Sequence, residues 1–160
     1  MQGEAFTVVV FAVGGQRHGL PASAVQELVR AVAVVPLPRA PAGVEGVINL
    51  RGQVVPVLSL RARLGLPDRP LEPSDHFIIA RTGQQHVALR VDRALDLVSL
   101  DAAEVDPGIE LVSAAGWVAR LPDGLVLIHD LNNLLSPSES AALADVLPTE
   151  LAQVEKGGPP

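Results

Sequence analysis

The sequence predicts an all-β protein with short helices, organised as two small barrel subdomains. Runs of β-branched and apolar residues recur at short intervals, and turns containing glycine or proline separate them. Helix signals are rarer, and the clearest one lies near the C-terminal end. The same landmarks also occur twice in the same order, which is typical of a duplicated unit. Closure of each unit into a barrel would remove the exposed edges of its short strands.

The first part of the chain contains two predicted hairpins joined by a proline-containing connector. Gly14-Gly15 forms the turn of the first hairpin, and Pro21 can open a short helical segment. In the second hairpin, the polar stretch from Asn49 to Gln53 is the turn, with Gly52 at a position where positive φ is easily reached. The expected elements, in order, are strands at 6–13 and 17–20, a helical segment at 23–27, a strand at 29–35, strands at 47–48 and 54–58, and a helical turn at 60–64.

The second part repeats the hairpin pattern and ends in the one strongly marked helix. A loop rich in proline and charge, 67–73, precedes it. Ser136 is a capping residue, and Pro137 and Glu139 complete the start signal, so that a helix is expected to run to Leu147. The expected strands are 77–80, 86–91, 117–121 and 125–128, and a mobile tail is expected over 148–160.

The internal repeat has an offset of about 68 to 71 residues. Gly15-Gln-Arg-His18 recurs as Gly83-Gln-Gln-His86, and Ala24–Val29 recurs as Arg93–Val98. The hairpin that begins at Gly46 recurs from Gly116. We therefore expect one domain, 1–147, made of two β-barrel subdomains in tandem, with approximate pseudo-repeats 5–66 and 75–135.

Composition excludes several classes of protein. Hydrophobic residues make up 48% of the 160, which indicates a folded chain, and the absence of cysteine excludes disulfides and thiolate metal sites. No signal peptide or membrane-length apolar run is visible, so we expect a cytoplasmic protein without direct membrane insertion. The formal charge of −6 divides into +3 for residues 1–90 and −9 for residues 91–160. An acidic protein without a basic cluster is a poor nucleic-acid binder.

No arrangement of residues predicts catalysis or a metal site. The four histidines do not form a close-spaced set with other ligands, and we expect them to be satisfied surface residues. Ser23, Ser59 and Ser113 lack the context of a catalytic nucleophile. The acidic group at 101–110 lacks the spacing of a calcium-binding loop, and we expect a solvated connector there. A binding module without a cofactor or a metal is therefore favoured over an enzyme, and a small β-hydrolase is the least favoured class.

The segment Gly46-Val-Ile-Asn-Leu-Arg-Gly-Gln-Val-Val-Pro-Val-Leu-Ser-Leu60 closely resembles the signature of the CheW family, the adaptors of bacterial chemotaxis arrays. The hairpin at 11–21, the block Val87-Ala-Leu-Arg-Val-Asp-Arg93 and the hairpin that starts at Val118 also resemble family blocks. The resemblance covers about residues 5 to 147. It implies two SH3-like five-stranded β-barrel subdomains, and an adaptor that couples chemoreceptors to a CheA-type histidine kinase.

The resemblance also implies which residues bind partners. Glu27 and Arg51 match a recurrent Glu and Arg of the family that are thought to pair, and such an exposed pair contributes about 0–1 kcal/mol to stability. Its use would be to orient the hairpin. Ser59 stands where the family often has Asp and keeps the capping ability. Four further residues match positions near the same surface: Val25, Gly46, Asn49 and Gly52.

The implied partners are the regulatory domain of a CheA-type kinase and the cytoplasmic tip of methyl-accepting chemoreceptors. We expect the receptor to bind a groove at the seam between two barrels of opposite charge balance. Its expected lining is Val25, Leu28, Val87 and Leu89, with Glu27 and Arg51 at the rim. Two alternatives are a regulatory CheW-like domain of a larger signalling protein and an adaptor of a surface-motility or other non-chemotaxis pathway.

Overall fold

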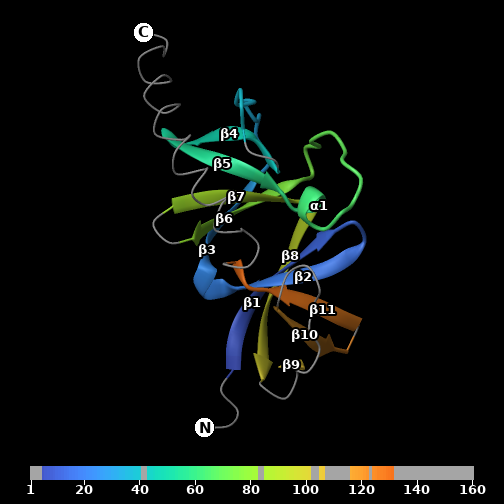
Figure 1. Cartoon of the computed structure of the whole chain (residues 1–160). Coiled ribbons are helices and arrows are strands. Elements are labelled where there is room, and N and C mark those ends of the chain that lie inside the picture. The colour runs from blue at the N-terminus through green and yellow to red at the C-terminus, as the bar shows by residue number, and fades with distance from the viewer. Residues whose placement is uncertain are drawn as a thin grey trace.

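The structure is a computed structural model, and it describes residues 5–40, 43–82, 85–101, 105–106, 116–122 and 124–131. Figure 1 shows two layers of strands, one above the other. The elements are β1 (Ala5–Val13), β2 (Gln16–Pro21), the 3-10 helix η1 (Ala22–Ala24), β3 (Val25–Arg30), β4 (Val44–Leu50), β5 (Gln53–Ser59), α1 (Leu60–Arg63), β6 (His76–Thr82), β7 (Gln85–Val91), β8 (Arg93–Asp101), β9 (Val105–Asp106), β10 (Gly116–Leu121) and β11 (Gly124–His129).

The strands form two sheets, which we name sheet A and sheet B. Sheet A has six strands in the order β8-β1-β2-β11-β10-β9, and sheet B has five in the order β3-β6-β7-β5-β4. Neighbouring strands are antiparallel except for one pair in each sheet, β11 with β2 and β5 with β7. The predicted all-β class with short helices is confirmed, and the arrangement fits two SH3-like barrel subdomains.

The internal repeat is visible in the register of the strands. Adding 69 to the number of Val25 and subtracting 69 from that of Ala80 converts this pair of sheet B into Ala94 and Phe11, which are paired in sheet A. Each of the two strand pairs skips one residue at the equivalent place, Gln26 in β3 and Leu95 in β8. The sequence repeat therefore corresponds to two sheets with matching strand order and matching bulges.

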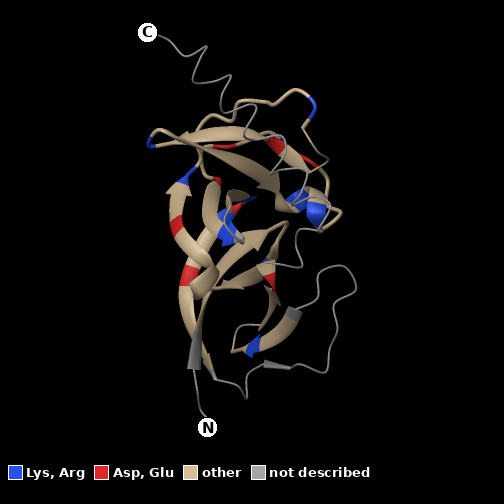
Figure 2. Cartoon of the chain, turned by 60° about the vertical axis from the view of Figure 1, so that its left-hand side comes forward, with Lys and Arg blue, Asp and Glu red and all other residues tan. Residues whose placement is uncertain are grey.

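The sheets do not follow the two segments 5–66 and 75–135. β1 and β2 of the first segment lie in sheet A with β8 to β11 of the second, and β6 and β7 lie in sheet B with β3, β4 and β5. This exchange corrects the expected tandem order of the strands. It also means that the charge balances of +3 and −9 do not separate into two barrels. In Figure 2, blue basic and red acidic positions are interspersed over the coloured part of the chain.

Three apolar clusters hold the sheets together. One lies within sheet A around Val8, Ala119 and Ile128, and one lies within sheet B around Ile48, Phe77 and Ile79. The largest joins the sheets. It is formed by buried residues of β1, β2, β5, α1, β6 and β7 and by Leu131: Phe11, Val13, Leu20, Leu58, Leu60, Ile78, Ala80, Val87, Leu89, Val91 and Leu131.

Several element boundaries differ from the sequence-based expectation. The helical segment expected at 23–27 is only η1, and β3 begins at Val25 because its backbone pairs with β6. The strand expected at 29–35 ends at Arg30, after which only Val35 forms a β-bridge, with Val47. The strand β8 was not predicted. The helical turn after Ser59 is confirmed as α1, with the Ser59 side chain accepting from the Ala62 N–H. The helix expected at 136–147 and the tail lie outside the described residues.

Candidate functional site

The tip of the β4–β5 hairpin is a two-residue turn formed by Arg51 and Gly52. Both have positive φ, 52° and 86°, and the last paired residues are Leu50 and Gln53. Two consecutive residues with positive φ make the turn type whose twist matches that of a hairpin. The Asn49 side chain reinforces it, because its Oδ1 accepts a 2.7 Å hydrogen bond from the Gly52 N–H. Positive φ at Gly52 was predicted, but positive φ at Arg51 was not.

Arg51 pairs with Glu27 across sheet B. Its Nη2 donates to Glu27 Oε2, while the Arg51 side chain is 68% exposed and that of Glu27 is 33% exposed. Glu27 lies on β3 and Arg51 lies beyond β4, at opposite edges of the five-stranded sheet. The expected pairing is present. It brings together the two edges of sheet B at the surface, where the ion pair adds little to stability.

Gly46 is required because a second segment of backbone passes close to it. The N–H and C=O of Val35 exchange two 2.8 Å hydrogen bonds with Val47. A Cβ at Gly46 would overlap the carbonyl oxygen of Val35, and the φ of Gly46 is 153°. Gly46 therefore has a structural role in attaching the 31–35 segment to the edge of sheet B, beside the exposed side chains of Val32 and Val35.

The other expected binding residues divide into surface and core. Leu28 is 42% exposed, and Val25 is partly buried against the core that joins the sheets. Val87 and Leu89 are 0% and 1% exposed and belong to that core. The expected groove with Val87 and Leu89 as its walls is wrong, because these two side chains fill the seam between the sheets. The surface that remains is on sheet B, around Val25, Glu27, Leu28, Asn49 and Arg51.

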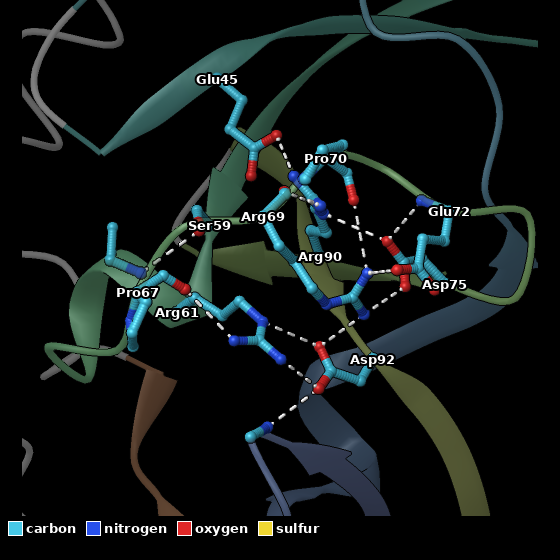
Figure 3. Close-up of polar contacts among 12 residues, drawn as sticks. Glu45, Ser59, Arg61, Pro67, Arg69, Pro70, Glu72, Asp75, Arg90 and Asp92 are labelled. Carbon is cyan, nitrogen blue, oxygen red and sulfur yellow. Dashed lines mark hydrogen bonds and ion pairs between the residues drawn. The ribbon is translucent and has the colours of Figure 1, made fainter.

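A network of ion pairs lies at the side of this seam (Figure 3). Asp75, which is fully buried, binds Arg69 at 2.7 Å and Arg90 Nε at 3.4 Å, and it also accepts from the Glu72 N–H. Arg90 reaches Glu45 at 2.8 Å and the carbonyl oxygen of Arg69 at 2.6 Å. A buried carboxylate is retained when paired and hydrogen-bonded in this way. The network fixes the loop between α1 and β6 against sheet B.

Two histidines also meet inside the molecule, which corrects the expectation that the histidines are surface residues. His18 and His129 are 3% and 2% exposed, and 2.9 Å separates Nδ1 of His18 from Nε2 of His129. Burial lowers the pKa of His18 to about 4, with the hydrogen bond to Val13 opposing the shift. Burial, and then the neighbouring His18, lower the pKa of His129 to about 4. Both rings are therefore neutral at pH 7.

The sequence gave no signal for either cluster. His18 and His129 are 111 residues apart, and neighbours in the sequence do not reveal a contact between β2 and the end of β11. Asp92 stands in the block that carries the family resemblance, but its partners lie in α1, a loop and a turn. Among the residues that the structure describes, no group of three or more His, Cys, Asp or Glu is arranged to hold a metal ion.

Comparison with known proteins matches this geometry to one family. The model of the CheW-like domain matches residues 7–139. A chemotaxis protein CheW of Rhizobium meliloti is 34% identical over 142 residues, which cover 84% of this chain and 90% of the relative. A chemotaxis protein CheW of Treponema pallidum is 28% identical over 152 residues, 89% of each chain. Protein FrzA of Myxococcus xanthus is 34% identical over 97 residues, 61% of each chain.

A solved structure shares the fold. The crystal structure of the scaffolding protein TtCheW from Thermoanaerobacter tengcongensis superposes with a TM-score of 0.74 at 26% identity, and the match covers 87% of this chain and 91% of that one. Among the helices in the described part of the chain, none is long and apolar enough to span a membrane.

Proposed function

This chain belongs to the CheW-like domain family, and from that premise we propose that it is an adaptor that couples chemoreceptors to a CheA-type histidine kinase in a chemosensory array. The partners are the regulatory domain of the kinase and the cytoplasmic tip of methyl-accepting receptors. The protein acts without catalysis and without a cofactor, in the cytoplasm. The unit that does this is the domain 1–147, to which the two-sheet architecture contributes both subdomains.

The observation that carries the proposal is the surface of sheet B around the β4–β5 hairpin. Its arginine is held at an exposed tip by a positive-φ turn and by the ion pair with Glu27. Exposed apolar side chains adjoin the pair: Leu28 at 42%, Val32 at 45% and Val35 at 59%. Apolar area with a polar rim is the usual composition of a protein-binding surface. The hairpin gives the surface a rigid position, as a binding site on an adaptor needs.

We expect the kinase regulatory domain to bind with a dissociation constant of about 1 µM or tighter, on the order of −8 kcal/mol. Titration calorimetry of the full chain with the regulatory domain of the kinase from the same cell measures this directly. Absence of heat and of co-elution at tens of micromolar would contradict the proposal. A matched pair of variants locates the surface, with Leu28→Ser in the proposed site and Leu125→Ser, also exposed, on β11 of sheet A.

A second candidate is an adaptor of another chemosensory pathway, for surface motility or a different output. The likeness to FrzA, a relative not named as a chemotaxis protein, favours it. The same chain could also serve as the regulatory CheW-like domain within a larger signalling protein. Deletion of the gene separates these outputs, because a chemotaxis adaptor is needed for swimming toward attractants, whereas a surface-motility adaptor is needed for spreading on a solid medium.

A further inference from the structure

The chain crosses between the two sheets at two places, and one of them carries a buried set of charges. It passes from sheet A to sheet B through η1, Ala22–Ala24, and returns from β7 to β8 at Asp92. The residue equivalent to Asp92 at the first crossover, 69 positions earlier, is Ser23, which is exposed. Only the second crossover therefore has a carboxylate at the point where the chain changes sheet.

The Asp92 carboxylate binds groups that belong to both sides of the seam. From sheet A, the Gly14 N–H in the β1–β2 turn donates to Oδ2 at 2.9 Å. From the sheet B side, Arg61 of α1 donates to both carboxylate oxygens, through Nε at 3.2 Å and Nη2 at 2.8 Å. Arg69, in the loop after α1, donates to Oδ1 at 3.0 Å. Figure 3 shows these donors converging on Asp92.

The backbone at this position is fixed as well. The Asp92 N–H donates to the carbonyl oxygen of Ala12 in β1 at 3.0 Å. The side chains of Asp92, Arg61 and Arg69 are 24%, 17% and 23% exposed, so the ion pairs are only partly screened by solvent. Burial raises the pKa of Asp92, but the hydrogen bonds from Arg61, Gly14 and Arg69 outweigh it, and the pKa is lowered. The carboxylate is therefore charged at neutral pH.

Each of the two arginines is also anchored to the sheet B side, so that neither is a loose surface cation. Arg61 Nη1 donates to the carbonyl oxygen of Pro67, and Arg69 Nη2 binds the buried Asp75 just before β6. A displacement of the Gly14 turn relative to α1 would therefore break charge-assisted hydrogen bonds on both oxygens of one carboxylate. The apolar core that joins the sheets has no comparable directional contact, since dispersion contacts are individually weak.

We propose that Asp92 is an electrostatic latch that sets the orientation of sheet A relative to sheet B. Removal of its charge leaves both sheets folded and allows them to sample a range of orientations. The consequence for signalling rests on the proposed function, because fixed orientation matters there only if partners bind on both sheets. The latch itself requires no partner.

The absence of cysteine makes the test direct, since spin labels attach only at introduced cysteines. Gln53→Cys on β5 and Ser99→Cys on β8 place one label on each sheet at an exposed position. Pulsed electron–electron resonance then gives the distribution of distances between the labels. With Asp92→Asn we expect a distribution at least twice as wide as that of the labelled parent. In the parent, raising the salt to about 1 M widens the distribution by a smaller factor, because the Debye length falls to roughly 3 Å.

The matched control is Asp68→Asn, which removes the same charge from an exposed position in the loop that carries Arg69. It should leave the distribution unchanged. Arg69→Gln and Arg61→Lys each remove part of the latch and should give intermediate widths, and they decide the question if Asp92→Asn does not fold. Equal widths in the parent and in all folded latch variants, even with a lower melting temperature, would overturn the proposal and make Asp92 a residue for stability alone. Kinase titration is not part of this test, so its failure is distinct from failure of the proposed function.

Discussion

The two sheets have equivalent strands, yet equivalent positions hold different residues. Adding 69 to His18 gives Val87, and subtracting 71 from His129 gives Leu58, by the same offsets that relate the parallel pair Val57–Ala88 to Ile128–Gly19. In sheet B this place is an apolar contact within the central core. In sheet A it is a pair of neutral, buried histidines. The fold therefore accepts either chemistry at this place, and the histidine version makes stability depend on pH.

A similar difference separates the two hairpins that close the sheets. Val35 pairs with Val47 beside β4, and Asp106 pairs with Val118 beside β10, 71 residues later in both cases. The β4 strand has Gly46 next to this contact, whereas β10 has Trp117, which is 37% exposed. The position of Arg51 at the first tip is occupied by Pro122 at the second. The exposed arginine is thus a feature of sheet B alone.

The largest effect is expected from Gly46→Ala, which tests whether sheet B needs the close approach that sheet A does without. The added methyl group overlaps the backbone of Val35, so one of the two segments must move. We expect a loss of roughly 3 kcal/mol in the free energy of unfolding, by denaturant titration.

Gly52→Ala is the matched control for Gly46→Ala. Gly52 also has positive φ, but no atom lies within 4 Å of an added Cβ. Its cost should be about 1 kcal/mol, from the backbone conformation alone. If the two variants lose the same stability, the contact with Val35 is not what requires glycine at Gly46.

The next effect concerns the histidine pair and its apolar counterpart. The folded-state pKa values of about 4 lie below the ordinary value of 6.5, so the unfolded chain binds more protons between these values. Stability is therefore fully present above pH 6.5 and is lost as the pH falls toward 4. We expect a loss of roughly 2 kcal/mol between pH 7 and pH 5, from urea unfolding at each pH.

The double variant His18→Val with His129→Leu copies the sheet B residues into sheet A. It should be at least as stable as the parent at pH 7 and should lose most of the decline between pH 7 and pH 5. His86→Gln, at a partly buried histidine outside the pair, is the control and should retain the decline. A double variant whose stability falls with pH as steeply as that of the parent would show that other groups cause the acid sensitivity.

The same comparison shows what the sequence contains and what it lacks. Strand runs and turn residues are local, so the hairpins and the repeat could be predicted from them. The exchange of strands between the sheets depends on long-range pairing, and two tandem barrels satisfy the same local pattern. Val87 reads as a strand residue in either arrangement, and only the packing of β7 against β1 and β2 places it in the core. The contacts of Asp92 and of His129 are also long-range and leave no local pattern.

The smallest effect on stability, and the sharpest contrast between the two hairpin tips, is expected at Arg51. Its side chain is 68% exposed, so Arg51→Ala removes little buried area and one surface ion pair. The backbone strain of positive φ is common to arginine and alanine. The free energy of unfolding should therefore change by less than about 1 kcal/mol, while binding of the kinase domain or the receptor tip weakens.

Arg51→Gly separates the side chain from the backbone conformation at the same position. Glycine adopts positive φ without strain, so this variant should be as stable as the parent or more stable, and it should lose the same binding as Arg51→Ala. Arg120→Ala, at an exposed arginine of β10 in sheet A, is the matched control for the loss of a positive charge. If Arg51→Ala lowers the melting temperature by many degrees, or if Arg120→Ala weakens binding equally, the tip of sheet B is not a specific binding element. A selective loss at Arg51 would assign the difference between the hairpins to function, since the ion pair with Glu27 contributes too little to folding to explain it.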